Sequence, residues 1–162
     1  MKTVVCFGDS NTWGAATVPR PDGRYAPHER WPGVLRAELG GTWVVHEEGL
    51  NGRTTVTDDP IEFECSKNGA RALPVILHTH KPIDALIIKL GTNDHKIRFA
   101  KTPWDIAAGV GVLVQMAKAS PVGPGGKPPR ILVICPAQML DKIGDPFVDM
   151  FAGAAEKSRE TP

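Results

Sequence analysis

The sequence lacks most of the features that mark membrane, metal-binding and nucleic-acid-binding proteins. None of its apolar runs approaches the roughly 20 residues that a membrane-spanning helix needs. It contains no Cys-x-x-Cys or His-x-x-x-His pair, which argues against a zinc site. The formal net charge is +1 and no basic block is longer than a pair, so the charge pattern favours neither nucleic acid nor an anionic membrane. We therefore expect a soluble protein without a metal ion or cofactor, and with neither nucleic acid nor membrane as a partner.

Cysteine is also scarce, with three residues at wide spacing in a chain of 162. An odd number of distant cysteines is not typical of a disulfide framework. Cys6 and Cys135 each lie at or near the end of an apolar run, where we expect buried thiols. Residues 1–7 are too short for a signal peptide and are typical of a first strand. These features favour a reducing, cytoplasmic setting.

Short apolar runs, rich in β-branched residues, predict strands at residues 3–7, 43–46, 85–90 and 131–135. The last two runs are continuous rather than alternating, which is typical of parallel strands covered on both faces. Between the runs, apolar residues at helical spacing predict helices at residues 31–39, 70–80 and 106–119. Thr102 and Pro103 form a strong start signal for the last of these helices. This alternation predicts one α/β domain over residues 1–162, a sandwich built around a parallel sheet.

The remaining segments give weaker signals. Residues 121–129 are rich in glycine and proline, which predicts an irregular surface loop. Residues 145–160 carry apolar side chains at helical spacing and predict a further helix.

Polar, glycine-containing segments follow the first three predicted strands. They are Gly8-Asp9-Ser10-Asn11, Gly49-Leu50-Asn51-Gly52-Arg53-Thr54 and Gly91-Thr92-Asn93-Asp94. Each alone is typical of a capped turn. In an open parallel sheet, however, the carboxyl ends of the strands meet at one edge, where ligands bind. A serine at the start of a helix, with glycine N–H and asparagine amide donors nearby, favours an activated nucleophile with an oxyanion hole.

Three of these blocks resemble the first three sequence blocks of the GDSL, or SGNH, hydrolases: Gly8-Asp9-Ser10, the loop glycine Gly52 and Gly91-Thr92-Asn93-Asp94. Longer stretches resemble the small bacterial arylesterase and acyltransferase branch, among them Gly8-Asp9-Ser10-Asn11-Thr12-Trp13-Gly14 and Arg30-Trp31-Pro32-Gly33-Val34-Leu35. The resemblance extends from Lys2 to about Glu160. It implies a flavodoxin-like three-layer sandwich with a parallel sheet.

The resemblance also implies individual roles. Ser10 would be the nucleophile, and the oxyanion hole would consist of the backbone N–H groups of Ser10 and Gly52 and the side-chain amide of Asn93. Asp9 and Asp94 would brace the turns. Trp13 would line the acyl or alcohol pocket, with buried packing an equal alternative. Apart from the resemblance, His95 directly follows Asn93-Asp94, so we expect it near the pocket as a pocket-rim or substrate-contact residue, with a role as the base a less favoured alternative.

One block of the family pattern is missing. The family's base and its orienting carboxylate come from an Asp-x-x-His motif after a fifth strand, and this sequence contains no Asp-x-x-His. Its five histidines are His28, His46, His78, His80 and His95, none at the matching position. We therefore expect a C-terminally truncated hydrolase without the fifth strand and last helix, in which residues 131–135 form an exposed edge.

The leading hypothesis is a serine-dependent ester hydrolase that forms an acyl-enzyme at Ser10 on short-chain esters and passes the acyl group to water or an alcohol. Members of the branch often form higher oligomers, which implies a homo-oligomer. One alternative is a catalytically silent remnant that keeps the oxyanion hole without its base. Another is a flavodoxin-like nucleotide or phosphate binder, which is disfavoured because the chain has neither Gly-x-Gly-x-x-Gly nor a Walker motif.

Overall fold

The computed structural model describes residues 1–161 and has a parallel sheet at its centre. The four strands lie in the order β2-β1-β3-β4 and are β1 (Lys2–Gly8), β2 (Trp43–Gly49), β3 (Ala85–Lys89) and β4 (Arg130–Val133). The helices are α1 (Ser10–Trp13), α2 (Trp31–Leu39), α3 (Gly69–His80), α4 (Pro103–Ala119) and α5 (Ala154–Glu160). Single 3-10 turns are η1 (Gly40–Thr42), η2 (Asn93–His95), η3 (Ile97–Phe99) and η4 (Pro124–Gly126). The predicted α/β class is therefore confirmed.

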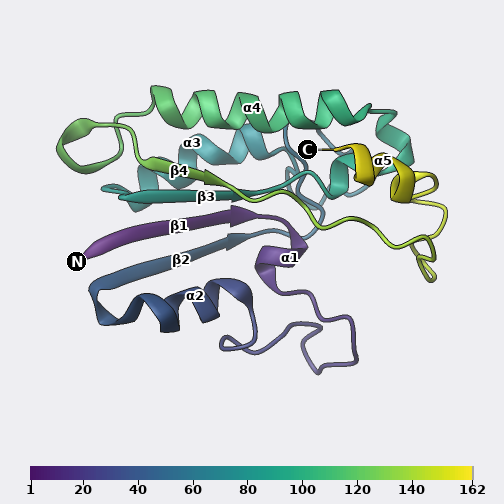
Figure 1. Ribbon diagram of the computed structural model, residues 1–162, viewed down its shortest axis with the longest axis horizontal. Coiled ribbons are helices and arrows are strands. Elements are labelled where there is room, and N and C mark those ends of the chain that lie inside the picture. Colours follow the sequence, from purple (N-terminus) through teal and green to yellow (C-terminus); the bar gives the residue numbers. More distant parts are fainter. Residues whose placement is uncertain (162) are drawn as a thin grey trace.

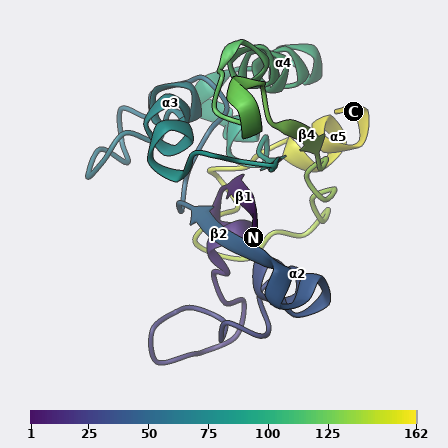
Figure 2. The ribbon, with the colours of Figure 1, turned by 90° about the vertical axis from the view of Figure 1, so that its left-hand side faces the viewer.

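Helices cover both faces of the sheet. Figure 1 shows α2 below the strands and α3 and α4 above them, and Figure 2 shows the same layers along the sheet. The chain passes from β1 to β2 on one side and then crosses to β3 on the other side of β1. This reversal of strand order creates a switch point beside β1, at the end of the sheet where α1 and the polar loops lie.

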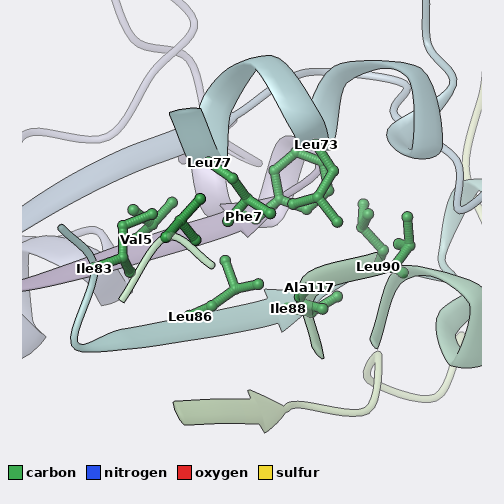
Figure 3. Packing of buried hydrophobic residues seen from close by; sticks show 11 residues of the cluster. Val5, Phe7, Leu73, Leu77, Ile83, Leu86, Ile88, Leu90 and Ala117 are labelled. Carbon is green, nitrogen blue, oxygen red and sulfur yellow. The ribbon is translucent and has the colours of Figure 1, made fainter. Parts of the chain in front are cut away.

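Two apolar clusters hold the layers together. The larger one lies between the sheet and the α3–α4 layer and is built on Phe7, Leu73, Leu86 and Leu113, all fully buried (Figure 3). The smaller one lies between the sheet and α2 and contains Val4, Cys6, Val45 and Ile87. Alternate residues of β1 thus enter opposite clusters, which explains why its sequence is apolar without interruption.

Local start signals place the helices correctly. Thr102 and Asp105 form a reciprocal capping box at the start of α4, as the sequence predicts for Thr102. Asn68 caps α3 by accepting a hydrogen bond from the backbone N–H of Ala70 at 3.0 Å. The predicted helices 31–39, 70–80 and 106–119 are confirmed, with α4 extended to its cap at Thr102.

Two predictions about the second half of the chain are wrong. The helix predicted from residue 145 begins only at Ala154, because Gly153 adopts a left-handed conformation that separates it from the turns before it. Cys135 is exposed rather than buried, because β4 ends at Val133 and is an edge strand. The irregular surface loop predicted at residues 121–129 is confirmed, and it contains one short 3-10 turn, η4, with two glycines of positive φ. No strand follows β4 within residues 1–161.

Candidate functional site

Hydrogen bonds join the loops that follow β1, β2 and β3 into one unit. The backbone N–H of Leu50 donates to the carbonyl of Gly8 at 3.1 Å, which joins the ends of β2 and β1. Asp94, after β3, accepts from the backbone N–H and the hydroxyl of Thr55 at 2.9 and 2.6 Å. Lys101 lies 3.2 Å from the same carboxylate. The three family-like blocks therefore meet at the switch point.

Ser10 is half-buried and is the first residue of α1. Asp9 caps this single helical turn by accepting hydrogen bonds from the backbone N–H and side-chain amide of Asn11, at 2.9 and 3.1 Å. Burial raises the pKa of Asp9 above its ordinary value, although the hydrogen bonds from Asn11 oppose the shift. Asp9 thus fixes the turn that presents Ser10 to the site.

Gly52 lies on the neighbouring loop with φ of 81°, a left-handed conformation that favours glycine. A Cβ at this position would also collide with the carboxylate of Glu62. That carboxylate is held by ion pairs with Lys96 and with Arg98, the latter at 2.9 Å. Asp59, whose side chain is fully buried, completes the cluster 2.5 Å from Arg98. Conformation and lack of space together require glycine at residue 52.

Asn93 begins η2 and is buried. Its side-chain nitrogen donates a hydrogen bond to the backbone carbonyl of Arg53 at 3.1 Å. A primary amide carries two N–H donors, so this bond fixes the orientation of the amide and leaves a second donor for another acceptor. The amide of Asn93 is therefore anchored to Arg53, the residue that follows Gly52, and keeps one N–H donor free for another acceptor.

Trp13 is half-buried at the end of α1, three residues after Ser10 and so on the same side of the helical turn. Its backbone carbonyl accepts from Nε of Arg24 at 2.6 Å, and the guanidinium carbon of Arg24 lies 4.7 Å from the centre of the Trp13 ring. Trp13 lines a cavity of about 600 Å³ together with Arg20, Tyr25 and Arg30. A role in substrate binding stays a prediction that this position favours.

His95 lies beneath the loop rather than at its surface, with 1% of its area exposed. Its Nδ1 is 2.9 Å from the carbonyl of Gly91 and its Nε2 is 3.1 Å from Oγ1 of Thr161. Burial lowers the pKa of His95, so the neutral ring is favoured. Contact between His95 and a substrate stays a prediction, and the burial of the ring counts against it.

Other histidines are also engaged away from Ser10. Nε2 of His80 lies 2.6 Å from the carboxylate of Glu48, and its ring stacks on His46 with centroids 4.0 Å apart. No hydrogen bond joins a histidine to Ser10 in residues 1–161. The same residues contain no group of three His, Cys, Asp or Glu side chains that could hold a metal ion, and none of their helices is long and apolar enough to cross a membrane.

Sequence patterns predicted no role for Arg53 or Glu62, although both contact the predicted site. Arg53 directly follows Gly52, and a charged residue inside a block of small polar residues is the one signal that pointed to it. Glu62 lies in the long segment between β2 and α3, where nothing in the sequence fixes its distance from Gly52. Its position depends on Lys96 and Arg98, which lie more than 30 residues away along the chain.

Comparisons with known proteins agree with this geometry. The model of the GDSL-like lipase/acylhydrolase family matches residues 6–160. The inhibitor-bound aryl esterase of M. smegmatis superposes with a TM-score of 0.91 and 43% sequence identity, over 99% of this chain and 76% of that one. A carbohydrate acetylesterase family member from Sinorhizobium meliloti gives a TM-score of 0.90 and 41% identity, over 98% of this chain and 74% of that one. No curated protein matches the sequence. By fold, sequence and arrangement of its polar loops, the chain belongs to the GDSL-like lipase/acylhydrolase family, whose members are ester-hydrolysing enzymes.

Proposed function

We propose that this chain is a serine-dependent carboxylic ester hydrolase of the arylesterase and acyltransferase type, which acts on short-chain esters through an acyl-enzyme at Ser10. The observation that carries the proposal is the anchored amide of Asn93, held by the residue next to Gly52 at the edge where Ser10 also lies. The similar solved structures are named as an aryl esterase and a carbohydrate acetylesterase family member, which supports an ester as substrate.

In this mechanism the hydroxyl oxygen of Ser10 attacks the carbonyl carbon of the ester. The carbonyl oxygen becomes an oxyanion that accepts hydrogen bonds from the backbone N–H groups of Ser10 and Gly52 and from the free donor of Asn93. Collapse of the intermediate expels the alcohol and leaves an acyl-Ser10 ester. Water or a second alcohol then attacks this ester, which releases the acid or a new ester and restores Ser10.

The proton of Ser10 needs an acceptor. No histidine in residues 1–161 is hydrogen-bonded to Ser10, so we propose that solvent accepts this proton and supplies one to the departing alkoxide. The oxyanion hole and binding alone sustain about 10³–10⁴-fold acceleration over water in hydrolases stripped of their triad. We therefore expect slow turnover whose rate rises with pH.

The test is hydrolysis of an activated aryl acetate by the wild-type chain and by the Ser10→Ala and Asn93→Ala variants, with folding checked by thermal unfolding. We expect Ser10→Ala to remove the enzymatic rate and Asn93→Ala to lower kcat about 100-fold or more. A fluorophosphonate probe, followed by intact mass, should add to Ser10 in the wild type alone. Equal rates in all three proteins would contradict the proposal.

A folded chain that neither turns over aryl acetate nor reacts with the probe would instead be the catalytically silent form, with an intact oxyanion hole and no base. The absence of Asp-x-x-His from the sequence is what favours this second candidate. In either case we propose a cytoplasmic protein with a small-molecule ester, and water or an alcohol, as its partners, and a homo-oligomer as its assembly. The three free cysteines support the reducing location.

A further inference from the structure

Arg53 is an unusual residue to find at the centre of this site. Its area is 5% exposed, and no ion pair with a carboxylate is formed by it within residues 1–161. One terminal nitrogen donates instead to two backbone carbonyls, those of Gly8 at 2.9 Å and Glu48 at 2.5 Å. The guanidinium carbon lies 4.5 Å from the centre of the Phe7 ring. The side chain of Arg53 therefore fastens the carboxyl ends of β1 and β2 to each other.

The backbone of the same residue fastens the third loop. The carbonyl of Arg53 accepts the hydrogen bond from Asn93 at 3.1 Å, and Gly52 precedes it in the chain. Gly8 lies two residues before Ser10. Arg53 is thus connected to all three donors of the predicted oxyanion hole. It is hydrogen-bonded to Asn93 and to Gly8 in the Ser10 loop, and it directly follows Gly52.

The position is costly for a cation. Burial lowers the pKa of Arg53 to about 10, so the guanidinium stays charged at neutral pH, and its Nε has no hydrogen-bond partner within residues 1–161. If the side chain only filled space, methionine or leucine would serve at a lower desolvation cost than a buried cation. A rigid fork of donors, by contrast, can bind two carbonyls at a fixed separation, which a flexible apolar side chain cannot do.

We propose that Arg53 is a positioning residue, which acts through Asn93 and the Gly8–Ser10 turn to hold the three oxyanion donors at one separation. The idea rests on the proposed function, because the donors matter only if an oxyanion forms there. Loss of the guanidinium would free the backbone at residues 52 and 53. The amide of Asn93 would then lose its fixed acceptor, and the donors would no longer converge.

The test compares Arg53→Met and Arg53→Lys in the full chain, with Arg71→Met as the control. Arg71 is an exposed arginine whose ion pair with Asp58 lies at the surface, and it has no part in the proposed mechanism. We expect Arg53→Met to lower kcat for aryl acetate about 10- to 100-fold with little change in KM. Arg53→Lys should restore part of the loss, and Arg71→Met should leave kcat unchanged.

A double-mutant cycle separates positioning from general damage. If Arg53 acts through Asn93, then Arg53→Met should cost much less in the Asn93→Ala background than in the wild type. Additive losses in kcat, or full activity in Arg53→Met, would overturn the proposal.

Nuclear magnetic resonance of the Asn93 side-chain amide gives a readout that needs no turnover. We expect one of its two protons to exchange with solvent at least about tenfold more slowly than the other in the wild type, and this difference to vanish in Arg53→Met. If Arg53→Met does not fold, Arg53→Lys takes its place. Equal exchange of both protons in the wild type would overturn the role of Arg53. If the wild type did not turn over aryl acetate but one Asn93 amide proton still exchanged slowly, only the proposed function would be contradicted.

Discussion

The two edges of the sheet are built in opposite ways. At the β2 edge, Glu47 points toward α2 and accepts hydrogen bonds from Arg30 at 2.9 Å and Arg36 at 2.7 Å. At the β4 edge, Leu132 and Val133 are 55% and 41% exposed and have no strand beyond them in residues 1–161. A charge cluster and α2 therefore cover one face of β2, whereas these apolar side chains of β4 are exposed. Figure 1 shows that β2 and β4 are the two outer strands, each with a partner strand on one side only.

This difference separates two ways of protecting a strand. The β2 strand is covered through one of its own side chains, because Glu47 forms ion pairs with Arg36 of α2 and with Arg30 in the loop before it. The β4 edge has no such residues, since Arg130 is its one charged side chain. We infer that stability should depend strongly on single side chains at β2 and hardly at all at β4, while association should show the reverse.

The largest effect should come from Glu47→Ala. This change leaves the guanidinium of Arg30, whose side chain is 10% exposed, without its carboxylate partner. We expect a loss of about 2–3 kcal/mol in the free energy of unfolding, measured with urea, because an unpaired and largely buried cation is costly. The matched control is Glu38→Ala, an exposed glutamate on α2, which should change it by less than about 0.5 kcal/mol. A small loss at residue 47 would remove the contrast between the edges.

The pH dependence of stability should sharpen the same contrast. Burial raises the pKa of Glu47, but the hydrogen bonds from Arg36 and Arg30 outweigh it and hold this pKa below its ordinary value of 4.5. A lowered carboxyl pKa gives stability that is present above the unfolded-state pKa and is lost as the pH falls through the folded-state pKa. Wild-type stability should therefore fall between about pH 5 and 3 more steeply than that of Glu47→Gln. Parallel curves would show that the pair contributes nothing.

The smallest effect on stability should come from Leu132→Lys at the β4 edge. An exposed side chain contributes little to the core, so we expect a change below about 0.5 kcal/mol. A lysine on an open edge should, however, reduce concentration-dependent association in sedimentation experiments. Val112→Lys, at a similarly exposed apolar residue of α4, should leave association unchanged. A wild-type chain that stays monomeric at all concentrations would show that the exposed β4 strand does not mediate association.

The layers of the fold could be predicted from the sequence, because the spacing of apolar residues and the residues that start and end helices are local features. Continuous apolar runs gave the strands, and Thr102 with Pro103 gave the start of α4. Prediction from the sequence failed at Cys135, whose exposure depends on where β4 lies in the sheet and not on the residues around it. The prediction of where α5 starts failed for a different reason. Apolar residues over 145–153 have helical spacing, but this segment forms turns, and Gly153 in a left-handed conformation separates them from the helix.

The candidate site shows the same division. Strand ends placed Ser10, Gly52 and Asn93 at one edge, because parallel strands share their direction. The contacts of Arg53 with Gly8 and of Glu62 with Lys96 could not be derived, since both join residues more than 30 positions apart through long side chains. Burial of His95 was missed because its contacts include residues distant in sequence, such as Thr161, whose Oγ1 lies 3.1 Å from Nε2 of His95.

The place of β1 has a consequence for synthesis on the ribosome. Of the four strands of the sheet, β1 is synthesised first, yet it pairs with residues 43–49 on one side and 85–89 on the other, and the backbone N–H of Thr3 donates to Asp84. At roughly 5–20 residues per second, the nascent chain exposes an apolar segment for about 4–16 s before its second neighbour exists. We expect residues 3–7 to be a binding segment for chaperones during translation, because no other strand in residues 1–161 waits as long for a neighbouring strand to be synthesised.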